Sequence, residues 1–273
     1  MNFKRIELIF LGTFIALNLF LLGMFIQNQN LQTEKVAQGN SNSTILKEIS
    51  NDQIKVGHLS NKSGFSYYAS GSQDDLLKTQ ANQLENQTVR MSKKKLKSEF
   101  KTPIELEDND PVKTINNKLS DPEFVSFGNE YKYNSELSTD NELIYTQTAF
   151  GYPIYSSSGQ IRFDLNSKRN IVSYTQGHLD NIASLRERSE TISQQQAVIL
   201  LYQYNQIPNN TKISWVKLGY TKYITVDNNQ VLIPTWQVAI RSQVGGNNNY
   251  VVKRINAFSG SLIKENENNT SLK

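Results

Sequence analysis

The chain has 273 residues, no cysteine, two histidines and a formal net charge of only +4. So small a charge argues against a nucleic-acid partner, and the lack of cysteine excludes disulfides and a lipoprotein cleavage site. With 37% hydrophobic residues, the chain can still bury an ordinary core.

A long apolar stretch lies near the N-terminus. Residues 6–26 read IELIFLGTFIALNLFLLGMFI and carry no charge after Glu7. About 20 such residues in a helix cross a hydrocarbon core of about 30 Å. A cleaved signal peptide is the alternative, but this apolar core is too long for one and no A-x-A site follows it. We predict a retained transmembrane anchor.

Basic residues on one side of this anchor predict its orientation. Lys4 and Arg5 precede it, whereas no basic residue follows it before Lys35. The positive-inside rule then keeps residues 1–5 in the cytoplasm and places the C-terminal domain outside the cell. We expect a single-pass protein of the cell membrane.

Small and polar residues within the anchor predict a contact with another helix. Asn18 lies near the middle of the span, where an unpaired amide is costly, and Gly12-x-x-x-Ala16 permits close approach of a second helix. The alternative is that Asn18 is accommodated by the backbone and by water defects of an isolated helix. Our candidate contact residues are Gly12, Ala16 and Asn18.

The next part of the chain predicts a stalk and then short elements. Residues 27–50 are polar and predict a juxtamembrane stalk with a helical turn. Short strands are expected near 54–59 and 65–69. Apolar spacing then predicts a helix over 73–87, with Ser72 as its N-cap.

Two charged clusters follow. The first is basic and consists of Lys93, Lys94, Lys95 and Lys97. We expect it to form the solvated face of a short helix over 93–100; the alternative is contact with an anionic envelope polymer or lipid. The other lacks the spacing of a calcium loop and predicts an acidic surface loop: Glu105, Glu107, Asp108 and Asp110. Asp110-Pro111 then begins a helix.

The remainder is dominated by strands around one helix. Ser193 and Gln196 fit a capping box for that helix. Asp227-Asn228-Asn229 and Gly245-Gly246-Asn247 are hairpin signals, and Pro234 suits a strand start. The predicted strands are 142–150, 152–155, 160–165, 171–176, 214–223, 231–242, 250–258 and 261–264.

This element order predicts an α+β fold in which helices pack on antiparallel sheets. The order of a helix followed by a meander occurs twice. We therefore expect an N-terminal subdomain over 51–183, a C-terminal subdomain over 189–264 and a polar tail over 265–273.

The sequence offers no convincing catalytic, metal or cofactor site. A Ser-His-Asp triad around His58 or His178 stays open in principle, yet the chain has no G-x-S-x-G elbow, P-loop or G-x-G-x-x-G. No pair stands out among four carboxylates: Glu130, Glu136, Asp140 and Glu142. Three aromatic residues favour packing over a ligand platform: Tyr174, Trp215 and Trp236. We expect a protein that is not an enzyme.

Several short motifs resemble known families. Residues 232–238 (LIPTWQV) and 255–260 (INAFSG) resemble the helix-plus-meander units of PepSY-type domains. Residues 151–155 (GYPIY) and 173–176 (SYTQ) resemble the YycI (WalI) family of Gram-positive bacteria. The short basic end followed by a span that carries an Asn is also similar to that family, so the resemblance extends over nearly the full chain.

The resemblance implies a regulator of the YycFG (WalRK) two-component system. Such a protein pairs with a YycH-like protein and acts on the YycG (WalK) sensor histidine kinase, which controls cell-wall metabolism. The family supplies no catalytic residues and no cofactor. The alternative is an envelope-anchored, PepSY-like module that binds a ligand or inhibits a protease.

Overall fold

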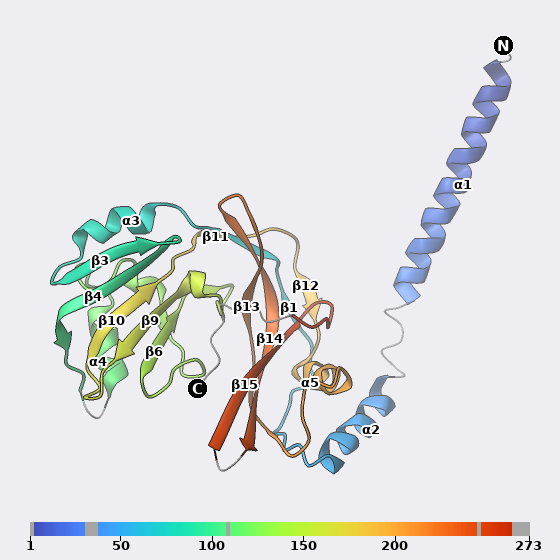
Figure 1. Ribbon diagram of the computed structural model, residues 1–273. Helices are drawn as coiled ribbons and strands as arrows, with labels where there is room; N and C mark the ends of the chain where they lie inside the picture. Colours follow the sequence, from blue (N-terminus) through green and yellow to red (C-terminus); the bar gives the residue numbers. More distant parts are fainter. Residues whose placement is uncertain (1–2, 31–37, 108–109, 245–246, 264–273) are drawn as a thin grey trace. The chain divides into compact units, whose positions relative to one another are not determined.

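Helices and antiparallel sheets make up the computed structural model, which describes residues 3–30, 38–107, 110–244 and 247–263 (Figure 1). The chain divides between Ile49 and Ser50 into two units. All sheets of the described residues belong to the second unit, and their strands pair antiparallel. The predicted α+β class is confirmed.

The first unit is helical. Helix α1 (Phe3–Asn30) contains the predicted span, and its large apolar side chains are exposed, Leu8 by 73% and Phe10 by 75%. Helix α2 (Gln38–Asn51) begins within the predicted stalk, where we expected only one helical turn. Residues 31–37 of that stalk lie outside the described residues.

A six-stranded sheet organises the first half of the second unit. Its central strands form the meander that the sequence predicted from 142 to 176. In spatial order the strands are β3 (Gln87–Ser92), β4 (Lys95–Ile104), β10 (Ile171–Gln176), β9 (Gln160–Leu165), β6 (Glu142–Thr146) and β5 (Lys132–Tyr133).

One face of this sheet carries an aromatic core. The Phe163 ring lies 5.8 Å from that of Phe124 and 5.5 Å from that of Tyr174, measured between centroids. Helices α3 (Leu76–Gln80) and α4 (Pro111–Lys118) contribute Leu77 and Ile115 to the same cluster. Since strand side chains alternate between faces, the polar neighbours of the core residues point the other way.

A five-stranded sheet organises the second half. Its longest strand is β14 (Asn229–Val244), which pairs with β13 (Lys212–Val226) along one edge. Along the other edge, two further strands pair with successive parts of β14. Those are β2 (Ala69–Ser72) and β15 (Asn247–Asn256), and β11 (Asp180–Ser184) pairs with β2. Smaller pairs are β1 (Gly64–Ser66) with β12 (Ser189–Thr191), and β7 (Thr148–Ala149) with β8 (Tyr152–Pro153).

Pro234 does not begin a strand as predicted but lies inside β14. A proline there costs little because the pairing partner changes at this point: β2 pairs as far as Leu232 and β15 from Thr235. The Pro234 carbonyl accepts a hydrogen bond from the Ala257 amide, so the residue still ties β14 to the chain after β15.

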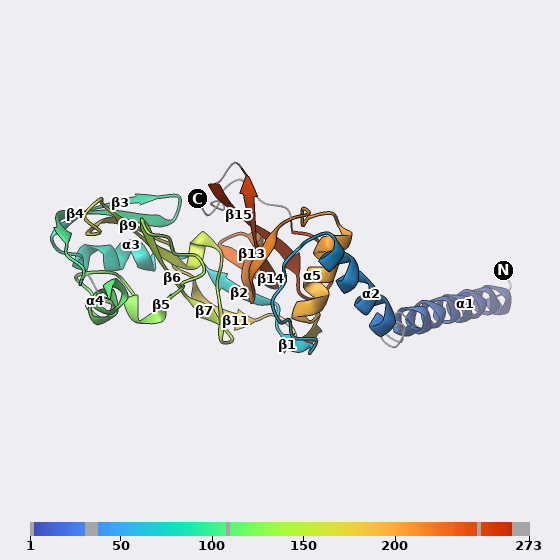
Figure 2. The same cartoon turned by 90° about the horizontal axis from the view of Figure 1, so that it is seen from below.

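Two predicted helix starts are confirmed. The side chain of Ser193 accepts a hydrogen bond from the Gln196 amide at the start of α5 (Gln194–Gln203), and Asp110 accepts one from the Lys113 amide at α4. Helix α5 contacts β14 and β15. Both views show the five-stranded sheet between the six-stranded sheet and α5 (Figures 1 and 2).

Three other predictions are wrong. The expected helix over 93–100 is strand β4, which a two-residue turn joins to β3; Lys93 and Lys94 both adopt positive φ there. The expected helix over 73–87 shrinks to α3 and a 3-10 turn, because Ser72 pairs in β2 instead of capping a helix. The expected strand over 54–59 is a single bridge at Lys55.

Candidate functional sites

Helix α1 is the first candidate site. Among the described residues it is the one helix long and apolar enough to cross a membrane, over Lys4–Met24 with a mean hydropathy of 2.1. None of that window is buried. Such a helix indicates an N-terminal membrane anchor followed by a folded domain.

The candidate contact residues of α1 are exposed in the isolated chain. The Asn18 side chain donates a hydrogen bond of 2.8 Å to the Phe14 carbonyl, one helical turn back. Apart from the neighbouring residues and the backbone of α1 itself, no described atom lies within 4 Å of the place where a Gly12 Cβ would be. Gly12, Ala16 and Asn18 stay candidates for a contact with a second helix, because the isolated chain offers them no partner helix.

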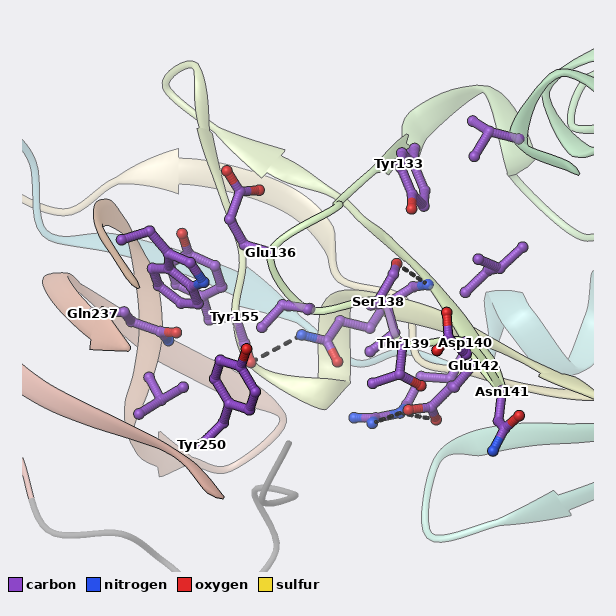
Figure 3. Close-up of a pocket in the computed structure, with 18 of the residues that line it drawn as sticks. Tyr133, Glu136, Ser138, Thr139, Asp140, Asn141, Glu142, Tyr155, Gln237 and Tyr250 are labelled. Carbon is purple, nitrogen blue, oxygen red and sulfur yellow. Dashed lines mark hydrogen bonds and ion pairs between the residues drawn. The ribbon is translucent and has the colours of Figure 1, made fainter. Parts of the chain in front are cut away.

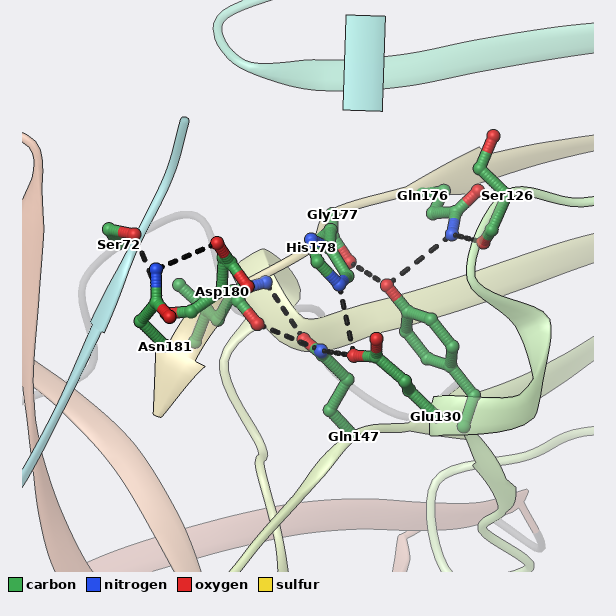
Figure 4. Close-up of polar contacts among 11 residues, drawn as sticks. Ser72, Ser126, Glu130, Gln147, Gln176, Gly177, His178, Asp180 and Asn181 are labelled. Carbon is green, nitrogen blue, oxygen red and sulfur yellow. Dashed lines mark hydrogen bonds and ion pairs between the residues drawn. The ribbon is translucent and has the colours of Figure 1, made fainter. Parts of the chain in front are cut away.

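A buried polar network surrounds His178, at the end of β10 (Figure 4). Its Nε2 lies 3.0 Å from Glu130 Oε2, and its ring stacks on that of Phe127 with centroids 4.2 Å apart. Gln147 Nε2 donates to the same Glu130 oxygen and to the Leu179 carbonyl. The network fixes the loop after β10 against two other segments, so a structural role explains it.

The network also changes the acidity of Glu130. The hydrogen bond from His178 lowers the pKa of Glu130, and a second bond from Gln147 adds to the effect, whereas partial burial opposes it. His178 itself is only 4% exposed at its side chain. Among the described residues no serine hydroxyl is bonded to His178, so the geometry brings together a hydrogen-bonded His–Glu pair and not a triad.

A cleft between the two sheets is the third candidate site (Figure 3). Its cavity volume is about 880 Å³, within the usual range of ligand pockets. One wall is the face of the six-stranded sheet opposite to its aromatic core, together with the loop before β6. The other wall is contributed by β13, β14 and β15 through Trp215, Gln237 and Tyr250.

Opposite charges pair in the cleft and at its border. Arg162 holds Glu142 with two hydrogen bonds of 2.7 Å, and Lys217 Nζ lies 3.2 Å from Glu136. Pairing of this kind cancels most of the field that each charge would project into the cavity. These four side chains therefore do not strongly attract either a cationic or an anionic ligand.

The structure brings together some of the residues considered from sequence and separates others. Glu136, Asp140 and Glu142 line the cleft, whereas Glu130 belongs to the His178 network. Tyr174 lies in the aromatic core. Trp215 lines the cleft, and Trp236 donates a hydrogen bond to the Ile192 carbonyl.

Several residues of the two charged clusters are bonded to other parts of the fold. Lys94 donates to the Gln73 carbonyl and to Asn228, and Lys95 donates to Ser157, so these lysines are not a solvated helix face. In the acidic segment Glu107 pairs with Lys113 at 3.5 Å. Asp108 lies outside the described residues, and no group of metal-ligating side chains occurs among the residues that are described.

Sequence reasoning missed Gln237 and Tyr155 as cleft residues. A signal for Gln237 was present, because a glutamine interrupts a run of apolar and small residues in the PTWQVAI segment. No signal marked Tyr155, whose place in the cleft depends on the distant strand β13.

Comparisons with known proteins bear on these sites. A family profile described as "YycI protein" matches residues 32–258. No protein with a curated description matches. Among solved structures, an uncharacterized protein from Eubacterium rectale ATCC 33656 is 10% identical, with a TM-score of 0.46, and the match covers 78% of this chain and 90% of that one.

A second solved structure is the C-terminal domain of Bacillus megaterium YpeB. It is 15% identical, with a TM-score of 0.37, and the match covers 70% of this chain and 95% of that one. Both TM-scores are below 0.5, so the assignment depends on the profile. Because that profile spans most of the folded part, the chain belongs to the YycI family, a family of regulators of the YycFG two-component system.

Proposed function

We propose that this protein is a single-pass membrane regulator that, with a YycH-like partner, modulates the YycG (WalK) sensor histidine kinase and through it cell-wall metabolism. Membership of the YycI family supports the pathway. The observation that carries the membrane-bound mode of action is α1, whose apolar side chains are exposed along Lys4–Met24. A surface of this kind is stable only in lipid or against other apolar helices.

The contact with the kinase or its partner is made within the bilayer. Gly12 and Ala16 let a second helix approach closely, and Asn18 supplies an amide that can bond across the interface. Such a bond contributes about 0.6–2 kcal/mol between helices in lipid. Lys4 and Arg5 hold the N-terminus in the cytoplasm, which leaves the folded unit outside.

A swap of the span tests this mechanism. Residues 6–26 are replaced by an unrelated single-pass helix of equal length, and kinase-dependent transcription and co-purification of membrane partners are measured. We expect both to fall. Unchanged regulation after the swap would contradict a contact inside the membrane.

Single substitutions refine the same test. Asn18→Leu removes the amide and is expected to weaken co-purification. Thr13→Val is the matched control, because the Thr13 hydroxyl bonds to the Ile9 carbonyl of its own helix and offers no proton to a partner. An equal effect of both changes would point to disturbance of the helix and away from a specific contact.

Labelling of single cysteines tests the orientation. The chain has no cysteine of its own, so Lys62→Cys and Asn2→Cys each create one reactive thiol. In intact cells a membrane-impermeant maleimide is expected to label Lys62→Cys and to spare Asn2→Cys until the cells are opened. The reverse pattern would overturn the proposed topology.

A further inference from the structure

The cross-strand register places one polar row on the cleft face of the five-stranded sheet. Gln237 of β14 pairs with Lys217 of β13 and with Arg254 of β15. The next row on the same face contains Trp215 and Val252. Since alternate residues of a strand point to one face, these side chains share the cleft face of the sheet, and four of them line the cavity: Trp215, Gln237, Val252 and Arg254.

Gln237 stands out in this row. Its side chain is fully buried, yet neither Nε2 nor Oε1 has a hydrogen-bond partner among the described residues. Buried polar groups are normally paired, and an amide left unpaired lowers the stability of the fold. Gln147 and Gln160, buried in the same unit, both donate hydrogen bonds to carbonyl groups. Gln237 therefore presents one donor and one acceptor to the cleft, both unused (Figure 3).

Tyr155 adds a further donor. Its ring lies directly over Gly219 of β13, where a Cβ would come within 2.2 Å of the ring atom Cε2. Burial raises the pKa of the Tyr155 hydroxyl, and the nearby Glu136 carboxylate adds to the shift, so the hydroxyl keeps its proton. Among the described residues nothing accepts that proton.

Two groups of the cleft without a partner, those of Gln237 and Tyr155, are neutral, although charged side chains also line it, Asp140, Arg169 and Arg254 among them. Within each of the Arg162–Glu142 and Lys217–Glu136 pairs the two charges offset each other. Gln237 and Tyr155 offer hydrogen bonds without net charge. Trp215 and Tyr250 add half-buried aromatic surface. A ligand that fits this set carries an N–H group and a C=O group side by side, with small apolar groups around them.

We propose that the cleft binds an extended peptide segment of another polypeptide, and that the Gln237 side chain pairs with the N–H and the C=O of one residue of that segment, which point to the same side in an extended chain. Two such bonds favour a group with both a donor and an acceptor over groups that can only donate or only accept. The inference does not depend on the proposed function, because it concerns the folded unit and not α1.

Fluorescence of Trp215 tests the proposal in the full-length chain in detergent. The chain has two tryptophans, so Trp236→Phe leaves Trp215 as the sole reporter. The probe is the blocked peptide N-acetyl-Ala-Ala-Ala-N-methylamide. We expect a saturable change with a Kd of about 1 mM, as suits a short ligand with few contacts.

A second probe and two variants make the test specific. The depsipeptide analogue, in which an ester oxygen replaces the N–H of the central alanine, is expected to bind about tenfold more weakly, a loss of about 1.4 kcal/mol. Gln237→Leu should lose binding to a similar extent, and its melting temperature should rise, because the unpaired amide is gone. Thr235→Val is the matched control, since Thr235 is buried on the same strand but does not line the cleft; its affinity should be unchanged.

Each remaining outcome contradicts the proposal. Absence of saturation with the peptide, or equal affinity of Gln237→Leu and the parent, would exclude an amide site at Gln237. A lower melting temperature of Gln237→Leu without any peptide binding would show that water, and not a peptide, satisfies this amide.

Discussion

The two faces of the six-stranded sheet differ although the same strands build both. In β9, Ile161 and Phe163 point into the aromatic core, whereas Gln160 and Arg162, which alternate with them, point toward the cleft. One face is filled by stacked rings, and the other borders a cavity of about 880 Å³. A strict alternation along one strand therefore separates a side that stabilises the fold from a side that is available to a ligand.

The aromatic face explains why the fold can contain an open cleft on the other face of the same sheet. The aromatic face supplies burial without help from the other face, because a filled core of this kind contributes most of the favourable free energy. The cleft face can then keep ion pairs and an unpaired amide that a small core could not tolerate. Changes to the two faces should have separable effects, and this expectation can be tested.

The largest effect is expected from Phe163→Ala. Phe163 is fully buried, and its loss should destabilise the second unit by about 3–5 kcal/mol through lost burial and a residual cavity. Denaturant unfolding followed by tyrosine and tryptophan fluorescence measures the change. The neighbour Asp164→Ala is the control, because Asp164 is exposed on the opposite face and should cost less than about 1 kcal/mol. Equal costs would contradict the division of roles.

A smaller loss is expected from Gly128→Ala, in the segment that covers the aromatic face. A Cβ at this position would lie 1.9 Å from the Leu119 carbonyl oxygen, so the backbone must shift. We expect destabilisation of about 1–3 kcal/mol, as is usual for overpacking. Gly57→Ala is the matched control, since nothing lies within 4 Å of its Cβ position. Thermal melting of both variants decides whether this segment is as tightly packed as the distances indicate.

Local chemistry explains which elements were predictable. Asp110 and Ser193 cap helices because their side chains satisfy amides a few residues away, and this information lies wholly in the neighbouring sequence. The helix predicted over 93–100 failed because Lys93-Lys94 forms a hairpin turn without the usual glycine or asparagine. The alternation of buried Leu96 and Ser98 with the more exposed charged residues Lys95, Lys97 and Glu99 was the overlooked strand signal.

The cleft could not be predicted in the same way. The cleft lies between a segment around Tyr155 and the strands β13, β14 and β15. The sequence of one strand does not indicate which distant segment will pack against that strand. The span of α1 was predictable because its length and composition respond to a bilayer and need no tertiary contact. Helix–helix contacts at Asn18 stay a prediction for the opposite reason, because they need a second chain.

A moderate effect is expected from the Arg162–Glu142 pair on the cleft face. The pair is bidentate and its side chains are 20% and 24% exposed, so a double-mutant cycle with Arg162→Met and Glu142→Gln should give a coupling of about 1 kcal/mol. Such a cycle isolates the pair from the burial that each side chain also loses. A coupling of several kcal/mol would mean that the cleft face also carries the stability of the sheet.

The smallest effect is expected where neither face is involved, at the Glu130–His178 contact beyond the end of β10. The folded-state pKa of Glu130 is lowered, so its contribution to stability is complete above the ordinary value of 4.5 and is lost as the pH falls through the lower, folded value. Because Glu130 is about half exposed, solvent screening keeps this contribution below about 1 kcal/mol. Glu130→Gln should therefore be less stable than the parent at neutral pH and equal to it in acid. Melting temperatures across that range measure the difference. A gap that persists at low pH would show that the carboxylate acts through packing and not through its charge.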